Sequence, residues 1–182
     1  MSLSDQLTGL ISRLARSAPA EHAGDSSLQK VLRKSALKPV NALVHMAIPF
    51  AGRAGFVVEV IGEGYLRARI PLKGNRNHMG SMYAGALFTL AEIPGGVMTI
   101  FDFGPAFVPI LKSLEMTYLK PARSDVTVAF ALSSSERDAI LQAVKETGKA
   151  EFTLRGSLRD NKDEVVARSE AHYQVRLKSN LS

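Results

Sequence analysis

The chain has 182 residues, a length that fits one domain with a substantial buried core. It contains no cysteine, which excludes disulfides, thiolate catalysis and cysteine-ligated metal sites. The formal net charge is +6; residues 1–55 hold seven Lys/Arg against three Asp/Glu, whereas residues 56–182 hold sixteen against fourteen. Because the larger segment is nearly balanced and carries no basic-aromatic clusters, we expect no nucleic-acid partner.

Two further classes of protein find no support in the sequence. The four histidines do not have the spacing of a metal-binding motif. No charge-free run of eighteen or more apolar residues appears, so we expect no membrane span. Residues 3–16 faintly resemble an organellar transit peptide, but Asp5 and the shortness of the segment argue against one. We therefore expect a cytoplasmic protein.

The pattern of the first fifty residues predicts helices joined by a linker of small residues. Apolar residues recur at helical spacing over 3–16, the linker covers 17–25, and a second helix is expected over 28–37, ended by Pro39. Residues 40–50 predict a further helical turn that packs on the domain. The expected division is a helical extension over 1–53 and a main domain over 54–178.

From residue 56 the apolar period changes from near 3.6 to 2. Residues 56–61 and 65–72 flank a glycine turn and predict a β-hairpin. Later segments with strand character are expected at 107–119, 126–132, 150–158 and 165–177. A short amphipathic helix is expected over 133–147, with Gly148 as its C-terminal signal.

Between the hairpin and the later strands lies a helix that is apolar on almost every face, expected over 82–101. A helix of this kind is buried, and Ser81 is a plausible N-cap for it. Glu92 is the only charged side chain between His78 and Asp102. An unpaired carboxylate is costly to bury, so Glu92 has a partner, a shifted pKa or a place in a wetted cleft. Pro94 predicts a kink or partial break just beyond it.

These elements predict an α+β fold in which a curved antiparallel sheet wraps around one long central helix. The sheet must bury one face, and only this helix is apolar enough to fill it. For Glu92 two interpretations stay open: a functional acid beside a backbone irregularity, or a structural acid paired with an arginine or capping a strained turn.

Residues 77–92, NHMGSMYAGALFTLAE, resemble the signature of hotdog-fold acyl-CoA thioesterases of the phenylacetate-pathway type. That signature has an Asn-x-x-Gly loop, His-Gly-Gly at the helix start and then Leu-Ala-Asp. Here Asn77 and Gly80 match the loop, residues 83–85 read Tyr-Ala-Gly, and residues 90–92 read Leu-Ala-Glu. The resemblance covers roughly residues 45–178 and is closest to a thioesterase-like branch without an assigned function.

The resemblance implies a hydrolase of fatty-acid metabolism that cleaves an acyl thioester of coenzyme A or of acyl carrier protein. It implies Glu92 as the acid that activates water or attacks the carbonyl, and the Ala84 or Gly85 N–H as the oxyanion donor. Asn77 would hold the water or the carbonyl. Coenzyme A enters only as part of the substrate, so no cofactor is expected. A homodimer, or a homotetramer built as a dimer of dimers, with the site at the subunit interface is implied in the same way.

The substrate-binding residues expected beside these are His78, Gly80, Tyr83, Lys112 and Thr117. Tyr83 replaces the family's histidine, so any hydrogen bond of that ring comes from a phenol or is lost. Lys112 interrupts an apolar run, and it could pair with Glu92, bind a substrate phosphate or lie on the surface as a solvated charge. Lys112 and Thr117 occupy the strand where the family often places a polar helper.

Two other functions remain open at this point. A dehydratase acting on 3-hydroxyacyl thioesters would pair His78 with Glu92, but the proline-glycine-rich run that normally follows such a histidine is absent. A non-catalytic acyl or lipid binder would use the same fold without turnover. The replacement at Tyr83 and the lack of an obvious second catalytic side chain keep this second alternative open beside thioester hydrolysis.

Overall fold

The computed structural model describes residues 37–180 of the chain, so the helices expected over 3–16 and 28–36 lie outside the described residues. The elements in chain order are α3 (Lys38–Ala47), α4 (Pro49–Arg53), β1 (Val57–Gly62), β2 (Tyr65–Ile70), α5 (Ala84–Phe103), β3 (Phe107–Tyr118), β4 (Val126–Ala131), α6 (Ser134–Thr147), β5 (Lys149–Arg159), β6 (Val165–Leu177) and the short 3-10 helix η1 (Lys178–Asn180).

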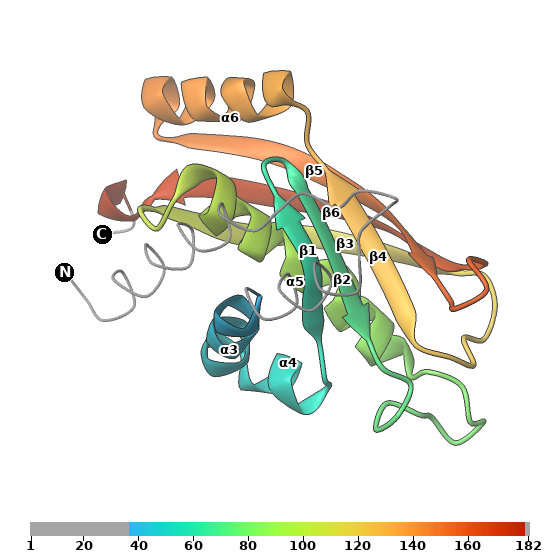
Figure 1. The fold of residues 1–182 in the computed structure, drawn as a ribbon. Helices are drawn as coiled ribbons and strands as arrows, with labels where there is room; N and C mark the ends of the chain where they lie inside the picture. The colour runs from blue at the N-terminus through green and yellow to red at the C-terminus, as the bar shows by residue number, and fades with distance from the viewer. Residues whose placement is uncertain (1–36, 181–182) are drawn as a thin grey trace, which may run out of the picture.

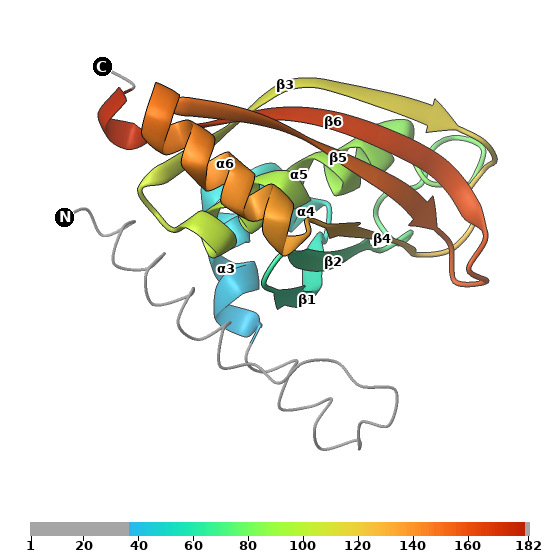
Figure 2. The same ribbon diagram turned by 90° about the horizontal axis from the view of Figure 1, so that it is seen from above.

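The six strands form one sheet in the order β1-β2-β4-β5-β6-β3, and every neighbouring pair is antiparallel. The sheet curves around α5, so that β3, β6 and β5 arch over one side of the helix while β1 and β2 lie on the other (Figures 1 and 2). The inward residues of the strands pack against α5 in a single core. The expected curved sheet around one long helix is confirmed.

The central helix differs from the expectation at its start. Tyr83, not Ser81, is the N-cap residue, and it has no side-chain cap hydrogen bond. The Ser81 hydroxyl instead donates to Asn77 Oδ1 at 3.2 Å. The expected N-cap is therefore wrong, because the Ser81 side chain forms its hydrogen bond within the preceding loop and not with the helix backbone.

Pro94 lies inside α5, yet the helix continues to Phe103 without a break. The proline removes one backbone donor, but the sheet buries this part of the helix, and packing holds a conformation that local preference disfavours. The Tyr173 hydroxyl of β6 also donates a hydrogen bond to the Glu92 carbonyl oxygen in the same region. The expected partial break at Pro94 is therefore wrong.

Helix α3 covers the free edge of β1. The Asn41 side chain accepts a hydrogen bond from Val58 N at 2.7 Å and donates one to Val58 O at 3.0 Å, as a paired strand would. His45 Nε2 lies 2.6 Å from Phe56 O. Pro39 lies in the first turn of α3, which fits the preference of proline for helix starts.

The far end of α5 is tied to two neighbours through Asp102, whose side chain is only 1% exposed. Asp102 Oδ1 accepts from Gly64 N in the β1–β2 turn at 3.0 Å and lies 3.6 Å from the guanidinium of Arg137 on α6. Helix α6 ends at Gly148 with φ 78°, as the sequence predicts, and it starts at a capping box between Ser133 and Glu136.

Among the described residues, α5 is the one helix that by length and composition could cross a membrane. The strands of the curved sheet surround it, and 61% of its apolar window is buried inside the fold. The core helix of a hotdog-type domain passes the same test, so the finding is weak evidence for a span.

Candidate functional site

Glu92 lies half-buried on α5, at one end of an apolar pocket. The pocket has a volume of about 280 Å³ and lies between α3, α5 and the inner faces of β1, β3 and β6. Burial raises the pKa of Glu92 above its ordinary value, since desolvation disfavours the charged form. No ion pair involving Glu92 forms within residues 37–180, which removes the paired-arginine interpretation for this part of the chain.

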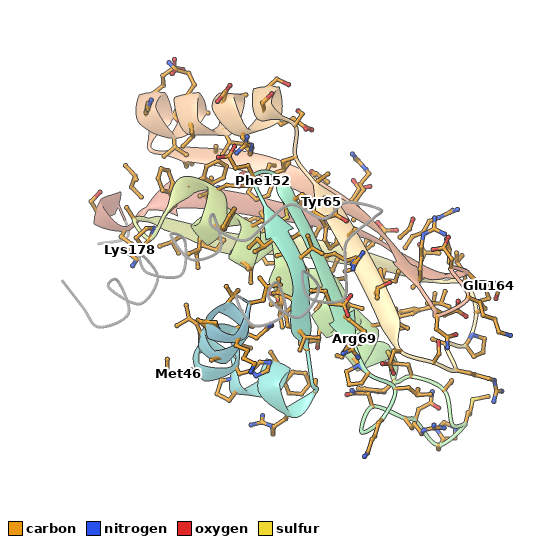
Figure 3. All side chains as sticks on the ribbon, viewed as in Figure 1. Met46, Tyr65, Arg69, Phe152, Glu164 and Lys178 are labelled. Carbon is orange, nitrogen blue, oxygen red and sulfur yellow. The ribbon has the colours of Figure 1, made fainter. Side chains whose placement is uncertain are left out.

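Tyr173, on β6, holds the segment of α5 that carries Glu92. Its hydroxyl donates to the Glu92 carbonyl oxygen, and its ring lies so close to Gly95 that any side chain there would collide with it. The Phe152 ring (labelled in Figure 3) stacks on the other side, with ring centroids 5.4 Å apart. Burial and the nearby Glu92 charge both raise the pKa of the Tyr173 phenol, so it stays a neutral donor.

The N-terminus of α5 offers two backbone donors. The Ala86 and Leu87 N–H groups donate to the Tyr83 carbonyl, at 3.0 and 3.3 Å. Within the described part of the chain, the Ala84 and Gly85 N–H groups have no acceptor, as expected for the first turn of a helix without a side-chain cap. Such N–H groups and the helix dipole favour an anion or an oxygen that gains negative charge.

These donors and Glu92 lie on one face of α5. Ala84, Phe88, Glu92 and Gly96 follow one another at intervals of four residues, and none of the four is buried. Eight residues of helix separate Ala84 from Glu92, a rise of about 12 Å, and helical side chains lean toward the N-terminus. The Glu92 side chain therefore leaves its backbone in the direction of the free N–H groups.

Asn77 organises the loop before α5. Its Oδ1 accepts from Met79 N at 2.9 Å and from Ser81 N and Ser81 Oγ at 3.2 Å each. Gly80 completes this turn with φ 75°, a left-handed conformation that glycine adopts without strain. The oxygen of the Asn77 amide is thus committed to the loop, while its Nδ2 has no acceptor among residues 37–180.

Two aromatic side chains flank the N-terminus of α5. Tyr83 is 58% exposed and Tyr118, at the end of β3, is 49% exposed. The Tyr118 hydroxyl donates to the Ala84 carbonyl oxygen at 3.3 Å, and partial burial together with Tyr83 raises the Tyr118 pKa. His78 is exposed in the preceding loop. Tyr83 therefore lies beside the free N–H groups, and Tyr118 is a neighbour that the sequence did not indicate.

Lys112 and Thr117 do not lie with Glu92. The pairing of β3 with β6 shifts register between Leu111 and Ser113, so that Leu111 lines the pocket of Glu92 while Lys112 bulges out. Lys112 is exposed in a separate hollow beside Glu151, Thr153 and His172. Thr117 is exposed as well, in a third hollow lined by charged residues of β5 and β6. The possible Lys112–Glu92 pair is therefore not formed.

Sequence reasoning missed two parts of the site. Helix α3 supplies one wall of the pocket, although the sequence indicated only a helical extension over residues 1–53. Tyr173 was recognised only as a strand residue, because its contact with Glu92 spans 81 positions of the chain. The described residues include no group of three or more His, Cys, Asp or Glu that could hold a metal ion.

Comparisons with known proteins agree with this architecture. The family profile described as "Domain of unknown function (DUF4442)" matches residues 38–175. A protein of unknown function from Pseudomonas aeruginosa, described as a probable thioesterase, has a crystal structure with 43% sequence identity and a TM-score of 0.72; the match covers 75% of this chain and 93% of that one. A search of curated proteins gave no match.

More distant structures share the fold alone. A protein of unknown function from Chlorobaculum tepidum is 14% identical, with a TM-score of 0.69 over 78% of this chain and 97% of that one. A thioesterase from Haemophilus influenzae is 16% identical, with a TM-score of 0.64 over 80% of this chain and 94% of that one. Since the profile spans most of the chain, this protein belongs to the DUF4442 family, a family of hotdog-fold, thioesterase-like proteins.

Proposed function

We propose that this protein hydrolyses acyl thioesters, with Glu92 as the catalytic carboxylate and the N-terminus of α5 as the oxyanion site. The observation that carries the proposal is the position of Glu92. It is the carboxylate at the end of an apolar pocket, and it lies on the same helix face as the two free N–H groups. The 43% identity to a protein described as a probable thioesterase gives independent support.

In the proposed reaction the acyl chain enters the pocket and the thioester carbonyl lies between Glu92 and the helix N-terminus. The Glu92 carboxylate takes a proton from a water molecule, whose oxygen attacks the carbonyl carbon. The Ala84 or Gly85 N–H donates to the oxygen that becomes negative. When the tetrahedral intermediate collapses, the carbon–sulfur bond breaks, and the thiolate leaves and takes up a proton. Direct attack by the carboxylate is the other route open to Glu92.

The loop before α5 supplies the remaining groups. Since its Oδ1 is committed to the loop, Asn77 would act through Nδ2, donating to the attacking water or to the carbonyl. His78 and Tyr83 are exposed next to the helix start and would contact the thiol portion of the substrate. Lys73, Arg76 and Arg123 are exposed cations near the same loop, suited to the phosphates of coenzyme A.

The substrate-binding role of Lys112 and Thr117 belongs to a second surface. Both residues lie away from the pocket of Glu92, so in this proposal they contact at most the distal part of the substrate. Lys112 shares its hollow with Thr153 and His172 but also with the carboxylate of Glu151, which disfavours a second anion there.

The proposal includes a second copy of the chain. Strand β3 forms one edge of the sheet, and exposed apolar side chains gather around the start of α5 and the end of β3. These side chains are Met79, Tyr83, Phe88, Tyr118 and Leu119. A homodimer that covers them would also shield the oxyanion site from water, which strengthens the electrostatic interactions within it.

A non-catalytic acyl binder is the second candidate. The pocket is apolar apart from Glu92 and the hydroxyl of Tyr173, and that hydroxyl is already engaged by a backbone carbonyl. A fatty acid would bind such a pocket without any turnover.

Thiol release from a panel of acyl-CoA substrates, from acetyl to palmitoyl and including aromatic acyl groups, separates the two candidates. The wild-type protein is expected to release thiol, and Glu92→Ala to lose at least 100-fold in kcat/KM, a typical size for the loss of a general base. Glu115→Ala, which removes an exposed carboxylate on β3, serves as the matched control. No release from any substrate by the folded wild-type protein would favour the binder.

A further inference from the structure

The pocket beside Glu92 has one polar end and one apolar end. Glu92 lines it at one side, and from there it follows α5 toward Ile100 and Phe101. Helix α3 closes it from outside with Val40, Leu43 and Val44. A ligand of matching chemistry has a polar head at Glu92 and an apolar chain that runs along the second half of α5.

The volume indicates the length of a chain that would fill the cavity. The cavity holds about 280 Å³. A methylene group occupies roughly the volume of one water molecule, about 30 Å³, so the cavity has room for about nine such groups. The chain that fills it is of medium length, about eight to ten carbons.

Gly95 and Gly96 follow each other on α5 but have different surroundings. A Cβ at Gly95 would collide with the ring of Tyr173, so close packing requires that glycine. A Cβ at Gly96 would meet only Pro109 Cγ, at 3.7 Å, which is an ordinary van der Waals contact. The fold therefore does not require a glycine at position 96, and a side chain there has room to extend.

The free space beside Gly96 is part of the pocket that Glu92 lines. Gly96 lines the cavity, lies one helical turn beyond Glu92 on the same face and is only half-buried. A glycine in a helix interior costs about 0.5–1 kcal/mol relative to alanine, so its presence here calls for a reason other than packing. That reason is the space it leaves directly below the carboxylate.

We propose that Gly96 is a specificity-determining residue that admits medium-length acyl chains into the pocket between α3 and α5. This inference rests on the proposed thioester hydrolysis, since it names the class of acyl group that reaches Glu92. The bare helix backbone at position 96 leaves a path from the carboxylate to the apolar end of the pocket.

The test compares kcat/KM for acetyl- to palmitoyl-CoA in wild type, Gly96→Ala and Gly96→Leu. We expect the wild type to prefer octanoyl- or decanoyl-CoA. In Gly96→Leu the value for decanoyl-CoA should fall at least tenfold more than that for butyryl-CoA, and Gly96→Ala should shift the preference in the same direction by less. Gly62→Leu is the matched control, because an added side chain at Gly62 meets open space.

The possible outcomes distinguish a failure of the role assigned to Gly96 from a failure of the proposed thioester hydrolysis. An active Gly96→Leu protein with the wild-type chain-length preference would overturn the role of Gly96 and leave thioester hydrolysis intact. A loss that is uniform over all chain lengths in Gly96→Leu, with no shift in Gly96→Ala, would overturn it as well. If the wild type hydrolyses no acyl-CoA, the proposed function fails; weaker octanoate binding by Gly96→Leu than by Gly62→Leu in calorimetry would then still support the pocket assignment.

Discussion

Glu92 links activity, pH and stability through a single half-buried carboxylate. Burial raises its pKa in the folded protein, so the folded state binds its proton more tightly than the unfolded state does. The contribution of Glu92 to stability is therefore complete below the unfolded pKa and is lost as pH rises through the folded pKa. Near neutral pH the ionised carboxylate costs stability.

Replacing Glu92 by glutamine should therefore stabilise the protein at pH 7.5. Glutamine keeps the shape and removes the charge, and we expect a melting temperature higher by about 2–4 °C, the shift that roughly 1 kcal/mol produces in a chain of this size. Calorimetry of the variant beside Glu115→Gln, whose carboxylate is exposed, measures the effect. A lower melting temperature for Glu92→Gln alone would mean that the charged form has a favourable partner.

The same shift predicts how the rate depends on pH. A carboxylate that accepts a proton works only when it is ionised, so kcat/KM should rise with pH through an inflection above 4.5, the ordinary value for a glutamate. The pH profile of thiol release in wild type gives the inflection, and the residual rate of Glu92→Gln should lack it. An inflection at or below the ordinary value would contradict a buried, unpaired Glu92.

At the scale of elements, α3 combines a structural and a functional role. Its Asn41 side chain satisfies both backbone groups of Val58 at the edge of β1, and its apolar residues close the pocket. Because α3 forms one wall of the cavity, anything that loosens it should also change the fit of the acyl chain.

Asn41→Ala should therefore weaken both the attachment of α3 to the edge of β1 and the fit of the acyl chain in the pocket. It leaves the Val58 N–H and carbonyl without partners, and we expect a loss of about 1–3 kcal/mol in unfolding free energy. Urea denaturation measures the loss, with Asn161→Ala in an exposed turn as the control. We also expect KM for decanoyl-CoA to rise more than KM for acetyl-CoA. Equal stability of the two variants would show that α3 is not held by Asn41.

The strands and the central helix were predictable because their patterns are local. Residues 65–70 alternate between buried and half-exposed positions after a glycine turn, and α5 is too apolar to lie on a surface. The predictions that failed depended on contacts made outside the helix itself, one within the preceding loop and one with the surrounding sheet. Ser81 has the residue type of an N-cap, but its hydroxyl donates to Asn77 instead. Pro94 has the residue type of a helix breaker, but the helix continues through it because the sheet packs around this segment.

The parts of the site that local patterns mark were predictable, and the parts that depend on contacts between distant segments were not. Glu92 stands out as a lone charge in an apolar helix, and the helix start follows from the loop motif. Tyr173 could not be recognised, because nothing in a long alternating strand marks the one inward residue that contacts Glu92. Lys112 was placed with Glu92 as one possibility, but Leu111 faces the pocket and strand alternation turns Lys112 to the other side of β3. The register shift after Leu111 then places Leu114 and Met116 on the core side, so that Thr117 faces away as well. A shift of one residue in a strand exchanges its faces.

At the scale of the whole molecule, one face of the described part of the chain, residues 37–180, carries a group of exposed apolar side chains. The five exposed apolar residues around the start of α5 lie beside the free N–H groups and the open edge of β3. Large exposed apolar areas of this kind commonly mark an interface. In our account a second copy of the chain covers this face.

A charge placed on this face should separate the copies. We expect a dimer, or a larger even assembly, for the wild type in light scattering coupled to size-exclusion chromatography. Phe88→Asp should give a monomer with at least tenfold lower thiol release, because Phe88 lies between Ala84 and Glu92 on the exposed face of α5. Met46→Asp is the control, since Met46 is 64% exposed at the outer side of α3 (Figure 3). A monomeric, fully active wild type would contradict the role of a second copy.

The proposed reaction requires that a thioester carbonyl binds between Glu92 and the N-terminus of α5. A crystal structure of Glu92→Gln with decanoyl-CoA tests it most directly, because the variant is expected to bind the substrate without cleaving it. We predict the carbonyl oxygen within hydrogen-bond distance of the Ala84 or Gly85 N–H and the chain in the pocket past Gly96. A carbonyl bound elsewhere, with these N–H groups still free, would contradict the account.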